Sequence, residues 1–188
     1  MNRLGKIFAA AALAVLPMAC KDEARNDADK AAENVKEQRE DLREQSNELG
    51  EALKDTRNAD DIVENSKDVA EQVRDLKTAE ADFGVRRGNR VASLRVVHSV
   101  VSSQPMLINT LGGVTTLTDK ARADLAEKMQ IFQMRVDEAG NAIESLHTAD
   151  ANGFETANDA AAQAMERLED ARENAWEALN DGDRIEAS

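Results

Sequence analysis

The strongest constraint on this chain is a row of apolar residues that recur at alternating spacings of four and three between Thr118 and about His147. Because an α-helix has 3.6 residues per turn, this spacing places all of them on one side of a helix. The row consists of Leu125, Met129, Phe132, Val136, Ala139, Ile143 and Leu146. It predicts an amphipathic helix whose apolar face packs against other helices, with Thr118 as its N-cap.

The segments on either side of this helix carry similar signals. After a loop at residues 148–153, a second apolar row ends near Gly182 and comprises Phe154, Ala161, Met165, Leu168, Ala175 and Leu179. Upstream, the string VASLRVVHSVV predicts a helix that is buried over much of its circumference. Pro105 suits the first turn of a following short helix, and we expect Gly112 and Gly113 to end it.

Residues 21–80 differ in character, because 11 Lys or Arg and 19 Asp or Glu make up half of this segment. A heptad row of Ala28, Val35, Leu42 and Leu49 favours a helix, although half of the alternate seam positions are polar. The row loses its register near residues 57–62, where we expect a break. A segment of this kind predicts a long charged helix or stalk, and a seam as thin as this one often needs a second chain.

The composition agrees with an all-α fold, since aromatic residues make up 3% of the chain and Pro occurs twice. We therefore predict an antiparallel three- to four-helix bundle with a long charged N-terminal helix or stalk. The expected organisation is a signal peptide at 1–19, a charged helical stalk at 20–82, a helical bundle at 83–182 and a tail at 183–188.

One group of charged residues could have a function of its own. Residues 83–118 contain Arg86, Arg87, Arg90 and Arg95 and no acidic residue, in a chain whose formal net charge is −13. These arginines either pair with the acidic helices or form a docking patch for an anionic partner such as a lipid head group, a wall polymer or an acidic protein. The overall acidity argues against nucleic acid as a partner, because binding phosphates needs a basic surface.

No group of residues points to catalysis or to a cofactor. Glu144 and His147 have the spacing of one half of a di-iron site, but the other histidine, His98, follows Arg95 at that spacing instead of a carboxylate. Ser99, Ser102 and Ser103 lie on an apolar helix without an acidic neighbour in sequence. We expect no enzyme activity, no metal and no cofactor.

The N-terminus predicts export from the cytoplasm. Arg3 and Lys6 precede an apolar run of about ten residues, which is half of what a membrane-spanning helix needs. The run ends in Leu16-Pro17-Met18-Ala19-Cys20, and Cys20 is the sole cysteine. This segment resembles the processing site of bacterial lipoproteins, although Pro17 stands where Leu is usual and Leu16 comes one place early. An ordinary secreted protein with a cysteine near its cleavage point is the alternative.

The resemblance implies that Cys20 is the first mature residue and carries the lipid, and that residues 1–19 are removed. Two or more acyl chains suffice for stable membrane anchoring. Lys21 after the cysteine implies sorting to the outer membrane, with the protein facing the periplasm. Loss of Arg3 and Lys6 would change the formal net charge from −13 to −15.

These expectations combine into a lipid-anchored helical protein of the cell envelope that acts as a structural or protein-interaction module without catalysis. Its partners would be the membrane, through the lipid, and another protein or a second copy, through the helices. The alternative is a periplasmic ligand-binding or stress-sensing bundle with a pocket among Val97, Phe132 and Trp176.

Overall fold

The computed structural model describes residues 18–54 and 59–181, with backbone alone at residues 18–22, 59 and 181. Five helices make up nearly all of these ranges: α1 (Met18–Ala52), α2 (Ala59–Ser102), α3 (Gln104–Val114), α4 (Asp119–Thr148) and α5 (Phe154–Asp181). The predicted all-α bundle is therefore confirmed. The predicted signal peptide lies almost wholly outside the described residues, and the predicted tail lies outside them entirely.

The ends of the helices follow local chemistry. Pro105 lies in the first turn of α3, where its missing N–H costs no helical hydrogen bond. The Thr118 side chain caps α4 by accepting a hydrogen bond of 3.2 Å from the backbone N–H of Ala121. Before α5, the carboxylate of Asp150 accepts the N–H of Gly153 at 2.9 Å. The predicted start of α3 and the predicted cap of α4 are both confirmed.

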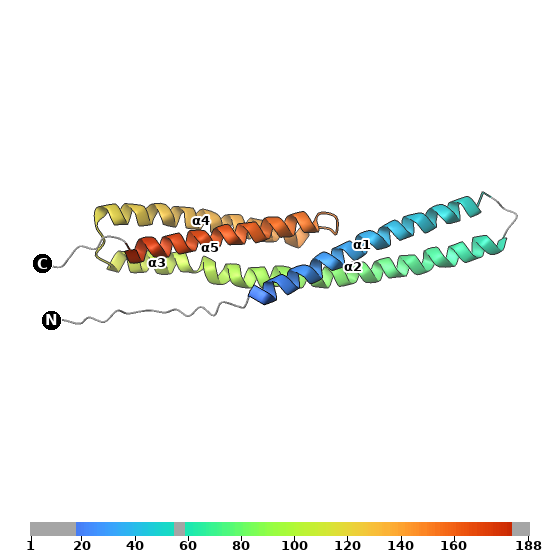
Figure 1. Cartoon of the computed structure of the whole chain (residues 1–188), viewed down its shortest axis with the longest axis horizontal. Coiled ribbons are helices and arrows are strands. Elements are labelled where there is room, and N and C mark those ends of the chain that lie inside the picture. The colour runs from blue at the N-terminus through green and yellow to red at the C-terminus, as the bar shows by residue number, and fades with distance from the viewer. Residues whose placement is uncertain (1–17, 55–58, 182–188) are drawn as a thin grey trace.

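The helices form an elongated rod (Figure 1). The second half of α2 packs with α3, α4 and α5 as a bundle in one half of the rod. The first half of α2 pairs with α1 and projects beyond that bundle as an antiparallel hairpin. We call the outer part of the hairpin, residues 36–54 at the end of α1 and residues 59–71 at the beginning of α2, the arm.

The core runs along the bundle and follows the predicted apolar rows. All seven residues of the α4 row are buried, and Phe132 and Leu146 are completely inaccessible to solvent. The α5 row is buried throughout as well, from Phe154 to Leu179. Helix α2 contributes Val91, Leu94 and Val101 on the side that faces α4 and α5.

The first turns of helix α1 pack against the bundle, so α1 does not form a stalk between residue 20 and the bundle. Ala28, Ala31 and Val35 of the predicted heptad region are buried where α1 lies against α2 and the beginning of α5. The end of α1 and the beginning of α2 lie at the far end of the arm (Figure 1). Helix α2 runs without interruption across residues 82 and 83, so the hairpin and the bundle share one helix.

The sequence predicts that Gly112 and Gly113 end α3, but the helix includes both glycines. The helix continues to Val114, and Thr115 follows in an extended conformation. Gly112 is buried, and a Cβ atom built on it would lie 2.8 Å from Cδ2 of Leu125 on α4. Its missing side chain therefore permits the close approach of α3 to α4.

Candidate interaction surfaces

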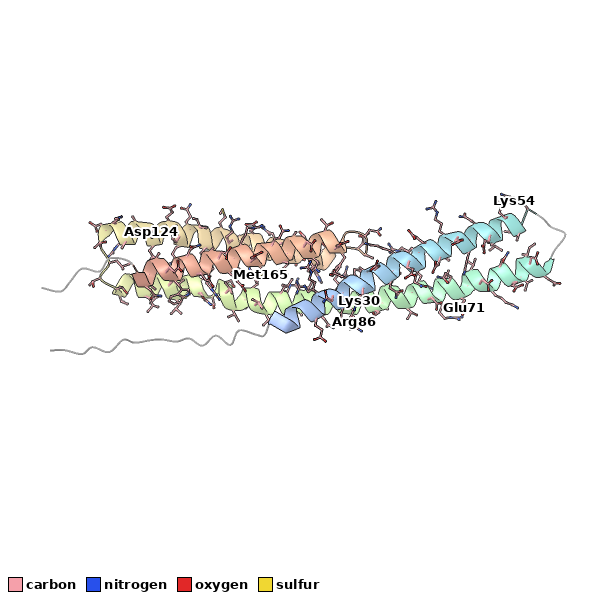
Figure 2. The ribbon with its side chains drawn as sticks, in the orientation of Figure 1. Lys30, Lys54, Glu71, Arg86, Asp124 and Met165 are labelled. Atoms are coloured by element: carbon pink, nitrogen blue, oxygen red, sulfur yellow. The ribbon has the colours of Figure 1, made fainter. Side chains whose placement is uncertain are left out.

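Arg86 lies where α1 crosses α2 (Figure 2). Its guanidinium group forms an ion pair of 3.2 Å with Asp27 on α1 and one of 3.4 Å with Asp82 on its own helix. All three side chains are about half exposed, so water screens these interactions. The ion pairs of Arg86 therefore show the register of the two antiparallel helices, but they contribute little to the stability of the helix pair.

Arg87 contacts the loop before α5. Its Nη1 donates a hydrogen bond to the carbonyl oxygen of Ala149, and its guanidinium carbon lies 5.4 Å from the centre of the Phe83 ring. Phe83 in turn packs edge to face against Phe154, with 5.3 Å between ring centres. The position of Arg87 is thus determined by an aromatic pair that joins α2 to α5.

Arg90 is buried, with 3% of its surface exposed. Its Nε donates to Oδ1 of Asn158 on α5 at 3.0 Å. The amide of the fully buried Asn158 then donates to Asp29 on α1 at 3.1 Å. Near this chain of hydrogen bonds, Arg25 of α1 pairs with Asp159 of α5. Three helices are joined here, at the junction of hairpin and bundle.

Arg95 lies further along α2 and pairs with Glu144 of α4 at 2.8 Å. The four arginines of the predicted patch are therefore distributed over separate contacts within the chain. Arg86 and Arg95 pair with acidic groups, whereas Arg87 donates to a carbonyl oxygen and Arg90 to an amide oxygen. Docking of an anionic partner to this group stays a prediction.

The residues weighed for metal binding lie in other environments. Glu144 is the partner of Arg95, and Nε2 of His98 lies 2.9 Å from the carbonyl oxygen of Val136. Within residues 18–54 and 59–181, no three side chains of His, Cys, Asp or Glu gather as metal ligands would.

The residues weighed for a ligand pocket are packed. Phe132 is fully buried, and Nε1 of the partly buried Trp176 donates to Oε1 of Gln104 at 3.0 Å. Two surface hollows of about 210 and 230 Å³ lie elsewhere, one on the arm and one at the junction of hairpin and bundle. The first is lined by Asp41, Glu44, Gln45 and Glu48.

The outer side of α2 and α3 is exposed and uncharged, which the sequence analysis missed. Val85, Val96 and Val100 project into solvent on the side of α2 opposite the core, and Met106 and Val114 of α3 are more than three-quarters exposed. We call this surface the uncharged face. The prediction that α2 is buried over much of its circumference here was wrong, because α4 and α5 cover one side of it.

The arm has the opposite character, being highly charged and poorly packed. Among its described side chains none is buried, and the row of Leu42 and Leu49 is only partly covered by α2. Leu53 and Val63 near its tip are each more than half exposed. Figure 2 shows Lys54 and Glu71 on this part of the rod.

Cys20 lies in the first turn of α1, and its side chain is not among those described. Within the described ranges, every helix is too short or too polar to cross a bilayer. Comparison with known proteins yields no relative: no protein-family model matches the chain, and no curated protein or solved structure is significantly similar to it.

Proposed function

We propose that this protein is a lipid-anchored, non-catalytic module of the bacterial cell envelope that binds another protein through its arm. The anchor is the lipid expected on Cys20, and Lys21 after it favours the outer membrane, facing the periplasm. In this reading the bundle is the rigid base and the arm is the part that meets the partner.

The observation that supports protein binding is the absence of buried side chains in the described part of the arm. A pair of helices without a shared core is only marginally stable in water, because most helical stability comes from packing an apolar face. Leu42 and Leu49 keep heptad spacing along this pair although α2 covers them only in part. A helix from another protein that packs on these residues would complete the core of the arm.

The charges of the arm suit recognition rather than catalysis. Basic and acidic residues are interleaved on the α1 side of the arm, and acidic residues predominate on its α2 side. Arg39 of the arm pairs at 2.9 Å with Glu80, which lies on α2 beyond the arm. Exposed charges of this kind contribute little to stability, but they select partners through complementary charge.

In-cell photo-crosslinking tests this proposal. A photoreactive amino acid at Val63, in the arm, is compared with one at Met134 on α4, because both side chains are 53% exposed and apolar. We expect a discrete crosslinked protein from position 63 and none of that mass from position 134. Identical products at the two positions, or none at position 63 in cells that retain the protein in the membrane fraction, would refute binding through the arm.

A further inference from the structure

The uncharged face is continuous along one side of the rod. Val85, Ala92 and Val96 follow one another at helical spacings of seven and four, and α3 continues the face with Met106 and Val114. On α2, these positions are turned by about 100–180° around the helix from the buried residues Val91, Leu94 and Val101, because each residue rotates the helix by about 100°. The face therefore points away from α4 and α5.

The segment that carries this face is the least acidic part of the protein. Residues 83–118 contain four arginines and no Asp or Glu, whereas the chain as a whole has a formal net charge of −13. Arg86 and Arg95 lie at the two edges of the face, half exposed. A surface bearing phosphate groups would meet uncharged side chains on this face, with the two arginines and their carboxylate partners at its edges.

The beginning of α1 borders the same face. Asp27 pairs with Arg86 in the antiparallel hairpin, so Cys20, seven residues earlier in α1, lies beside α2 about seven residues beyond Arg86. Helix α1 therefore begins at the level of the part of α2 that carries Ala92 and Val96. Figure 1 shows the beginning of α1 below α2, whereas α4 lies above it.

We infer that the uncharged face of α2 and α3 lies against the surface of the lipid bilayer that holds the anchor, so that the rod lies along the membrane. This inference rests on the lipid anchor proposed above. A lipid anchor at the beginning of α1, near the middle of the rod, brings the adjacent face to the bilayer at high effective concentration. Weak apolar contacts then suffice to hold the face on the lipid surface. The arginines at its edges then meet lipid phosphates.

A second copy of the chain is the less suitable occupant. Two copies joined through this face would bring their arginine-bearing segments together, where like charges repel. The phosphate groups of a bilayer carry the charge opposite to that of the arginines. The proposed lipid anchor also holds the bilayer near the beginning of α1. Charge complementarity and the position of α1 thus both favour the lipid surface.

Fluorescence quenching in vesicles tests the inference. The lipidated full chain is reconstituted into vesicles of phosphatidylethanolamine and phosphatidylglycerol, with an environment-sensitive dye on Val96→Cys or on Met134→Cys. Acylation of Cys20 leaves the introduced cysteine as the free thiol. Val96 and Met134 are both 53% exposed, so neither replacement disturbs the core, and Met134 lies on the outer side of α4.

We expect lipid-borne nitroxide to quench the dye at position 96 several-fold more than at position 134. Equal quenching at the two positions, in protein that sediments with the vesicles, would overturn the inference and leave the anchor intact. Self-quenching at position 96 that grows with the number of proteins per vesicle would also overturn it, in favour of a second copy. Failure of both labelled proteins to sediment would instead refute the anchor, and the inference with it.

Discussion

Nε of Arg90 on α2 donates a hydrogen bond of 3.0 Å to Oδ1 of Asn158 on α5, and both side chains are buried. Asn158 extends the connection to Asp29 on α1. A single amide therefore satisfies polar groups from two other helices at the junction of hairpin and bundle. Buried polar groups of this kind are costly when they lose a partner, which makes Asn158 the residue on which the junction most depends.

Replacing Asn158 by Ala is therefore expected to destabilise the protein by about 1–3 kcal/mol, because the acceptor for Arg90 and the donor to Asp29 are both lost. The free energy of unfolding from urea titration measures this change. Asn174→Ala, on the exposed side of the same helix, is the control and should stay within about 0.5 kcal/mol of the parent. Equal effects of the two replacements would show that the junction does not depend on the buried amide.

Gly112 and Gly113 are expected to respond differently to Ala. A Cβ atom at Gly112 would lie 2.8 Å from Leu125, so this buried leucine must shift, at a cost of about 1–3 kcal/mol that a gain of about 1 kcal/mol in helix propensity offsets only in part. A Cβ atom at Gly113 meets open space. Thermal unfolding should show Gly112→Ala melting below Gly113→Ala, and the reverse order would contradict the close approach of α3 and α4.

Glu138 makes the stability of the folded protein depend on pH. Its hydrogen bond with Arg135 is the main reason that the pKa of this carboxyl lies below its usual range; desolvation acts in the opposite direction, and the hydrogen bond with Arg167 on α5 lowers the pKa further. A lowered pKa in the folded state contributes stability above the ordinary carboxyl pKa, and this contribution is lost as the pH falls through the lowered value. Glu138→Gln should therefore lower the melting temperature at neutral pH and make no difference in strong acid.

Circular dichroism melts of Glu138→Gln across the acid range check this, with Asp137→Asn, the exposed neighbouring residue, as the control for removing one negative charge. A deficit in melting temperature that stays constant from neutral to strongly acidic pH would show that the ion pairs of Glu138 do not link α4 to α5.

Arg86 and Arg87 are adjacent, yet their replacements should differ in effect. Arg87→Ala removes a hydrogen bond to Ala149 and the contact with Phe83, worth about 1–2 kcal/mol together. Arg86→Ala removes half-exposed ion pairs worth less than about 1 kcal/mol. Chemical denaturation of the single variants measures the difference. In the double variant, a lower stability with unchanged binding of anionic vesicles or wall polymer would argue against a docking role for both.

Those features of the fold were predictable that depend on a single helix, because a periodic row of apolar residues determines that helix and its buried side. The α4 row from Leu125 to Leu146 is buried as its spacing predicts, and Thr118 and Pro105 mark helix starts because their side chains act on their own backbone. The break in register expected near residues 57–62 likewise matches the beginning of α2 at Ala59, whereas α1 already ends at Ala52. Local physics sufficed for each of these features.

Features that depend on which helix meets which were not predictable. The return of α1 to the bundle rests on Asp27, Asp29 and their partners on α2 and α5, and such pairings leave no periodic signal in a segment where half of the residues are charged. The exposure of Val96 depends on how many helices surround α2. A pair of glycines such as Gly112 and Gly113 is typical of a helix end. The role of Gly112 in letting α3 approach α4 depends on the position of Leu125 on another helix.

The most direct test of the central claim is cell fractionation with mass analysis of the N-terminal peptide. We predict that the protein sediments with the outer membrane, that its mature chain begins at Cys20 with a lipid attached, and that Cys20→Ser moves it to the soluble fraction. A Cys20→Ser protein that stays in the membrane fraction, or a mature chain with an unmodified cysteine, would contradict the lipid anchor.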